Sequence, residues 1–169
     1  MSSHVFDYVP VDDPLFGRVD VRLDEKAGEL IVEGEAIPRA VVRRAEGTPL
    51  ESHVPIGTRD TTRVTVTVAG AAVPLIPAKG LLTRRSYRVD AGRYRLVPCA
   101  LGESRLLLDR ERIGVFTSVG DGRVWSEWQD EGRRTPDDAA VGYALAAAFG
   151  TGAEPMWKLS LDAALSLFG

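Results

Sequence analysis

Few side chains in this sequence are of the types that carry catalysis or bind metals. Histidine occurs at His4 and His53, and cysteine only at Cys99. A general base needs a partner and a pocket, and two histidines with one cysteine cannot form the usual four-ligand zinc site. We interpret His53 as a solvated loop residue and Cys99 as a small buried hydrophobe, and we expect no cofactor. An enzyme is therefore the less favoured interpretation, with a hydrolase that uses His53 or Cys99 kept as an alternative.

Arginine is the residue type most suited to recognition here, because only three of the 21 basic residues are lysines. Four arginines surround an Asp-Ala-Gly turn at residues 90–92: Arg84, Arg88, Arg93 and Arg95. Residues alternate faces in a hairpin, so Arg93 and Arg95 should point away from Tyr94 and Leu96, towards solvent. Guanidinium groups gathered on one face would suit phosphate or an anionic lipid head group. The alternative is a solvated face on which these arginines pair with nearby acids such as Asp90.

The elements that carry these residues are mostly short strands. Alternating or β-branched runs recur roughly every 10 residues with no helical interval between them, which favours an antiparallel sandwich or barrel. The strongest signals lie at residues 18–23, 29–36, 39–44, 63–70, 84–99 and 104–129. Residues 1–17 have no periodicity, and we predict a loose N-terminal arm there. Residues 45–62 are turn-rich and predict the longest loop of the domain.

One helix is predicted at residues 136–149. Thr135 is a suitable N-cap, Pro136 suits the first helical position, and Gly150 stands where a left-handed C-terminal residue is usual. Residues 139–149 are apolar on every side, so protein should surround the helix. A second, short helix is expected from near Pro155 to the C-terminus.

Length and composition predict a single domain over residues 1–169. Apolar residues make up 44% and charged residues 27% of the chain, and the net charge is -3, which does not point to nucleic acid or a membrane surface. The longest apolar run is about 11 residues, against the roughly 20 that a transmembrane helix needs. With one cysteine and no signal-peptide pattern at the N-terminus, we expect a soluble, cytoplasmic protein.

Three stretches carry a resemblance to a known family. "YRLVPCALGESRLLLDRERIGVFTS", "VWSEWQ" and "DDAAVGYALAAAFG" resemble the later part of the tubby C-terminal-like superfamily, which includes LURP-one-related proteins, over about residues 84–150. The resemblance implies a closed antiparallel barrel of about 12 strands wrapped around a hydrophobic C-terminal helix, with lipid or phosphoinositide binding in some members. The chain departs from the family in its second C-terminal helix and in the about nine or ten strands that its pattern shows. No phosphoinositide-binding residue can be carried over.

The favoured function is a non-enzymatic tubby-like barrel domain that binds an anionic ligand or a protein partner. The alternative is a protein-interaction or assembly subunit on a β-sandwich, whose interface would be marked by Trp125, Trp128 and Trp157. Trp125 and Trp128 are three residues apart in one predicted strand, so they should face opposite sides and at least one should be buried. The identity of the ligand or partner and the oligomeric state do not follow from the sequence.

Overall fold

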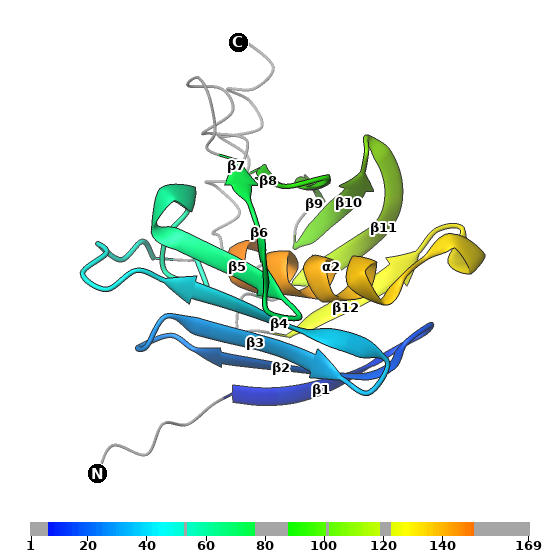
Figure 1. Ribbon diagram of the computed structural model, residues 1–169, viewed down its shortest axis with the longest axis horizontal. Helices are drawn as coiled ribbons and strands as arrows, with labels where there is room; N and C mark the ends of the chain where they lie inside the picture. The colour runs from blue at the N-terminus through cyan, green and yellow to red at the C-terminus, as the bar shows by residue number, and fades with distance from the viewer. Residues whose placement is uncertain (1–6, 53, 77–87, 101, 119–122, 151–169) are drawn as a thin grey trace.

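The computed structural model describes residues 7–52, 54–76, 88–100, 102–118 and 123–150, which form two six-stranded antiparallel sheets with one helix between them (Figure 1). In the first sheet, the strands follow chain order: β1 (Asp7–Asp13), β2 (Gly17–Asp24), β3 (Glu29–Gly34), β4 (Ile37–Arg44), β5 (Val64–Val68) and β6 (Ala71–Val73). The second sheet continues the order: β7 (Leu75–Ile76), β8 (Val89–Ala91), β9 (Tyr94–Ala100), β10 (Glu103–Leu108), β11 (Glu111–Ser118) and β12 (Val124–Trp128). Two short 3-10 helices occur outside the strands: η1 (Thr61–Arg63) and η2 (Glu131–Arg133).

The alternation predicted for the first sheet is confirmed. Val19, Val21 and Leu23 of β2 are buried in alternation, and so are Val64, Val66 and Val68 of β5. The prediction of a loose arm over residues 1–17 is wrong from residue 7 onward, because Asp7–Asp13 forms β1 and pairs with β2 along its whole length. Pro10 does not prevent this, since β1 is an edge strand and an edge tolerates a residue that cannot donate a hydrogen bond.

The second sheet carries the hairpin predicted around residues 90–92. Leu96 is buried and pairs with Val89, and Arg95 lies opposite Asp90. The chain passes from the first sheet to the second at Pro74, which separates β6 from β7. The strands are therefore arranged as two sheets, and no closed barrel is found in the described ranges; the β-rich class with a C-terminal helix is confirmed.

Helix α2 (Pro136–Phe149) begins at the predicted cap. Thr135 accepts a hydrogen bond from the backbone N–H of Asp138, and the Asp138 carboxylate accepts one from the backbone N–H of Thr135. The expected left-handed conformation of Gly150 is not found, since its φ is -57°. Glycine is required there because a Cβ would lie 2.4 Å from the Ser118 hydroxyl oxygen.

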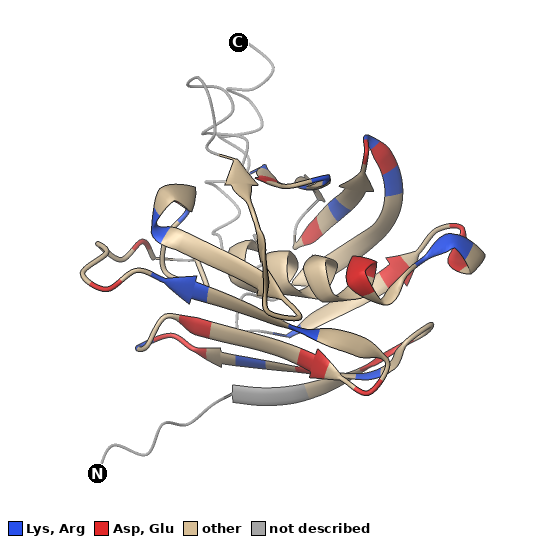
Figure 2. Ribbon diagram, in the orientation of Figure 1, with Lys and Arg blue, Asp and Glu red and all other residues tan. Residues whose placement is uncertain are grey.

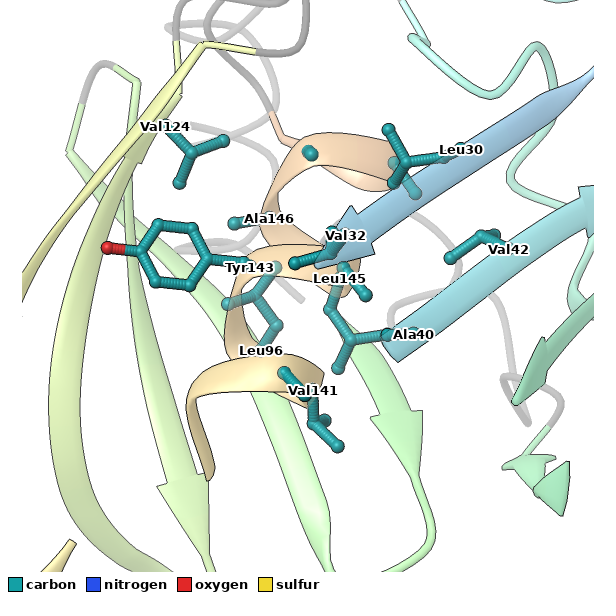
Figure 3. Packing of buried hydrophobic residues seen from close by; sticks show 14 of the residues in the cluster. Leu30, Val32, Ala40, Val42, Leu96, Val124, Val141, Tyr143, Leu145 and Ala146 are labelled. Atoms are coloured by element: carbon teal, nitrogen blue, oxygen red, sulfur yellow. The ribbon is translucent and has the colours of Figure 1, made fainter. Parts of the chain in front are cut away.

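Every residue of α2 from Asp138 to Phe149 is buried, as its apolar sequence predicts. The helix contacts β3, β4 and β5 of the first sheet and β9, β11 and β12 of the second. Figure 3 shows Tyr143 on the side of the helix where Val124 lies, while Val32 and Ala40 lie on the side of the first sheet. The hydrophobic core is thus formed by both sheets around this one helix.

The turn-rich segment between β4 and η1 covers the C-terminal end of α2. The backbone N–H of Ile56 donates to the carbonyl of Ala148, and Arg44 Nη1 donates to the carbonyl of Ile56. Residues 54–58 are buried. The second predicted C-terminal helix lies outside the described residues. Within the part of the chain that is described, no helix has the length and apolar character needed to cross a membrane.

Candidate functional site

The β8–β9 hairpin brings two of the four predicted arginines together. Arg88 Nη2 lies 3.1 Å from Asp90 Oδ2, and Arg95 Nε donates to Asp90 Oδ1 at 2.5 Å. Two guanidinium groups therefore share one carboxylate, which neutralises only one of their two charges. The Nε of Arg88 is buried and has no hydrogen-bond partner within the described ranges.

Arg93 is engaged elsewhere. It lies in the turn between β8 and β9 and forms an ion pair with Asp109, in the turn between β10 and β11. Their hydrogen bond raises the pKa of Arg93 and lowers the pKa of Asp109. Both side chains are largely exposed, so the pair adds little stability. Arg84 lies outside the described residues, so the predicted patch is represented by Arg88, Arg95 and, in a separate pair, Arg93.

Arg112 and Arg105 share the outer face of the second sheet with Arg95. Arg95 lies opposite Leu107 of β10, and Leu107 lies opposite Arg112 of β11, so all three residues are on the same face. Arg105, also on β10 and two positions from Leu107, is exposed on the same face. Counting alternate positions along residues 103–108 would have identified Arg105. It would have placed Arg112 on the inner face with Gly114 and Phe116, because the register shift between Leu106 and Leu107 interrupts the alternation of β11.

Basic and acidic residues both occur on strands of each sheet (Figure 2). On the first sheet, exposed arginines are also paired, as Arg43 is with Glu29 and Arg22 with Glu33. The feature of Arg88 and Arg95 that suits an anion is therefore not a surplus of basic residues over a whole face. It is the convergence of these two cations on one acid, Asp90.

A second polar cluster is buried where β1, β12 and α2 meet. Its centre is the carboxylate of Asp13, whose residue is only 5% exposed. Asp13 accepts hydrogen bonds from the backbone N–H groups of Leu15 and Phe16 and from three side chains: Ser126 Oγ at 2.6 Å, Trp128 Nε1 at 3.0 Å and Tyr143 OH at 2.6 Å. All five donors are neutral, so the negative charge is stabilised by hydrogen bonds alone.

The protonation states in this cluster follow from these contacts. Burial raises the pKa of Asp13, but its hydrogen bonds with Ser126, Tyr143, Leu15 and Trp128 together lower the pKa below its usual value. Burial and the Asp13 carboxylate both raise the pKa of Tyr143, so the phenol stays protonated and donates. Asp13 is thus held ionised, with its lone pairs already occupied, which suits a structural anion better than a general base.

A second buried carboxylate fixes the strand that carries Arg95. Tyr94 OH donates to Asp138 Oδ1 at 2.7 Å, and Asp138 Oδ2 accepts the backbone N–H of Thr135 at 2.9 Å. Burial is the largest cause that raises the pKa of Tyr94, and the hydrogen bond to Asp138 raises that pKa further. The start of β9 is thereby attached to the N-terminal end of α2.

Of the remaining candidate residues, the structure describes Cys99, Trp125 and Trp128. Cys99 is exposed on β9, so the prediction of a buried cysteine is wrong: a register shift places Cys99 between Pro98 and Ala100 with no residue opposite it on β10. Trp128 is buried and Trp125 is 49% exposed, which confirms that the two face opposite sides. His53 and Trp157 lie outside the described residues. In the described ranges, no three His, Cys, Asp or Glu side chains gather as a metal site requires.

Comparisons of the chain with protein-family models, with curated proteins and with solved structures find no match. The resemblance to the tubby C-terminal-like superfamily therefore stays a prediction.

Proposed function

We propose that this protein is a non-enzymatic β-rich binding domain whose ligand is an anion, either free phosphate or the phosphate of a lipid head group, held by Arg88 and Arg95. The observation that carries the proposal is the convergence of both guanidinium groups on Asp90. A guanidinium has five N–H donors, and one carboxylate uses only a few of the ten that these two arginines offer. Phosphate oxygens are the acceptors that such planar donor groups bind best.

The hairpin is suited to hold both arginines in place before a ligand arrives. Val89 and Ala91 of β8 are buried in the core, and Tyr94 at the start of β9 is hydrogen-bonded to Asp138 of the helix. Fixing the backbone and sharing Asp90 lowers the entropy that binding must remove from the two side chains.

The proposal includes a closed barrel of the tubby-like type around α2. Two features support closure: the chain continues directly from β6 into β7 through Pro74, and Asp13 of β1 is hydrogen-bonded to Ser126 and Trp128 of β12. Each edge of the first sheet is thereby linked to an edge of the second.

A protein partner is the second candidate, and Trp125 favours it. Its side chain is 49% exposed on the outer face of β12, and tryptophan is enriched among the residues that dominate binding energy at interfaces. If this candidate holds, Trp125→Ala abolishes capture of the partner while phosphate binding is unchanged.

The test of anion binding is a titration with inorganic phosphate, followed by NMR of the backbone amides, and sedimentation with vesicles of phosphatidylcholine with or without phosphatidylserine. Arg95→Gln and Arg88→Gln should each abolish the shifts at the β8–β9 hairpin. Arg43→Gln is the matched control, because Arg43 also forms an exposed ion pair, with Glu29, on the other sheet. Equal loss of binding in the control, or no shift in the unmodified protein, would overturn the proposal; phosphate binding without vesicle binding identifies the free anion as ligand.

A further inference from the structure

Among the described side chains of β1 and the turn that follows it, apolar residues are half-buried rather than fully buried. Strand β1 lies at the edge of the first sheet and, within the described residues, forms its ladder with β2 alone. Among its residues with described side chains, Pro10 and Asp12 are exposed and Val11 is half-buried, whereas fully buried apolar residues begin at Val19 in β2. Val11, Leu15 and Phe16 pack against the core but are only partly buried. Detaching residues 10–16 would therefore remove no fully buried apolar side chain, and the hydrophobic effect resists it less than it resists removal of β2.

The other edge of β1 contacts β12, and Asp13 fastens it there. In the described part of the chain, every hydrogen bond from β1 or its following turn to β12 or α2 ends on the Asp13 carboxylate. The same carboxylate accepts the N–H groups of Leu15 and Phe16 and so shapes the turn itself. The ring of Phe16 packs edge-on against Trp128, with centroids 5.9 Å apart.

We propose that residues 7–16 are a releasable strap, which Asp13 fastens to the second sheet and which can detach while β2–β12 and α2 stay folded. Proteins open locally where few fully buried apolar side chains resist, and residues 10–16 contain no fully buried apolar side chain. Release of the strap exposes the free backbone edges of β2 and β12 at the same time, which are the groups that an added strand can pair with. The strap is independent of the anion site, which lies on the β8–β9 hairpin.

Asp13→Asn removes the carboxylate that joins β1 to β12 and α2 but leaves the packing of the side chain nearly unchanged. Asparagine has nearly the same shape, but its amide NH₂ is a donor, and it would face a cage made of donors: Ser126, Trp128 and Tyr143. Asp138→Asn is the matched control, because Asp138 is also buried, at 1% exposure, and also accepts from a tyrosine, but it joins β9 to α2.

Hydrogen exchange of the full chain, followed by mass spectrometry, measures the release. In Asp13→Asn we expect exchange in residues 7–13 to accelerate by about tenfold or more, while residues 141–149 of α2 change by less than about threefold. In Asp138→Asn, residues 7–13 should not accelerate more than α2 does. Equal acceleration of β1 and α2 in Asp13→Asn would show that Asp13 holds the whole fold, and no acceleration of β1 would show that it fastens nothing; either result overturns the proposal.

Ser126→Ala provides the same test if Asp13→Asn does not fold. It removes one donor to Asp13 and leaves the carboxylate and the other four donors in place. We expect the same selective acceleration of residues 7–13, smaller in size, and acceleration shared equally with α2 would again count against the strap.

Discussion

The hydroxyl of Tyr143 donates a hydrogen bond of 2.6 Å to the carboxylate of Asp13, a residue 130 positions earlier in the chain. Tyr143 lies on the central helix and Asp13 ends the first strand, so this bond joins the beginning of the fold to its last described element. The ring of Tyr143 also packs edge-on against the ring of Phe116, with centroids 5.2 Å apart. One side chain thus contributes both apolar packing and a charged hydrogen bond.

The Tyr143→Phe variant separates these two contributions. The ring and its contact with Phe116 remain, but Asp13 loses one of its donors. A hydrogen bond to a charged group contributes about 1.5–3 kcal/mol, so we expect a loss of that size in the free energy of unfolding, measured by urea denaturation. Tyr94→Phe, which removes the bond to Asp138 instead, is the comparison for a buried phenol elsewhere. An unchanged midpoint in Tyr143→Phe would show that the bond to Asp13 adds nothing.

Stability should depend on the ionisation of Asp13 at acid pH. Its pKa in the folded state lies below the usual value of 3.8, so the unfolded chain binds the proton more tightly. The stabilisation is therefore fully present above about pH 4 and is lost as the pH falls through the lower, folded-state pKa. Urea denaturation at a series of pH values between 6 and 2 should show this loss.

Two variants assign that acid dependence to the buried carboxylate. In Asp13→Asn the slope of stability against pH below about pH 4 should be shallower, because the titrating group is gone. Asp109→Asn is the control: hydrogen bonding to Arg93 also lowers the pKa of Asp109, but that pair is exposed. If Asp109→Asn flattens the slope as much as Asp13→Asn does, the buried cluster is not its source.

Gly142 is needed for close packing in the middle of α2. A Cβ at this position would lie 2.3 Å from the ring of Phe116. Gly142→Ala should therefore destabilise the fold by about 1–3 kcal/mol, although alanine is the better helix former by about 1 kcal/mol. Gly132→Ala, where a Cβ would meet nothing within 4 Å, should be close to neutral. Thermal unfolding measures both, and a higher melting temperature for Gly142→Ala would show that Phe116 can move aside.

Local patterns predicted the helix and most strands correctly because each is specified by neighbouring residues. The Thr135 cap, Pro136 and the apolar run to Phe149 define α2 without any tertiary information, and the alternating valines of β2 and β5 define their buried faces. Strand β1 was missed because its sequence, DYVPVDD, has a proline and three acids. What makes it a strand is the ladder with β2 and the bonds of Asp13 to residues more than 100 positions away.

In the candidate sites too, the sequence predicts features that neighbouring residues specify and misses those that depend on contacts between distant residues. The outward direction of Arg95 follows from alternation. Cys99, which general residue preferences wrongly place in the core, is exposed at a register shift that no local pattern indicates. The pairing of Arg88 and Arg95 with Asp90 is expected as an alternative because Asp90 is close in sequence to both arginines. The buried cluster of Asp13 could not be found, since no local signal links Asp13 to Ser126 or Tyr143.

Arg44 holds the segment that covers the C-terminal end of α2, and its replacement by lysine should loosen that segment. Its Nη1 donates to the carbonyls of Ile56 at 2.8 Å and Glu25 at 3.2 Å, and its Nη2 donates to the carbonyl of Lys26 at 3.2 Å. An ammonium has no planar fork and cannot bridge these acceptors in the same geometry.

In Arg44→Lys we therefore expect faster exchange of the Ile56 amide, which is bonded to the Ala148 carbonyl, by about tenfold. Arg43→Lys is the matched control, because the neighbouring Arg43 is exposed and forms an ion pair with Glu29 on the adjacent strand β3. Amide exchange followed by NMR makes the comparison residue by residue. An Ile56 amide equally protected in both variants would mean that the segment is held by its own buried residues, Val54 to Thr58, rather than by the guanidinium that joins it to β4.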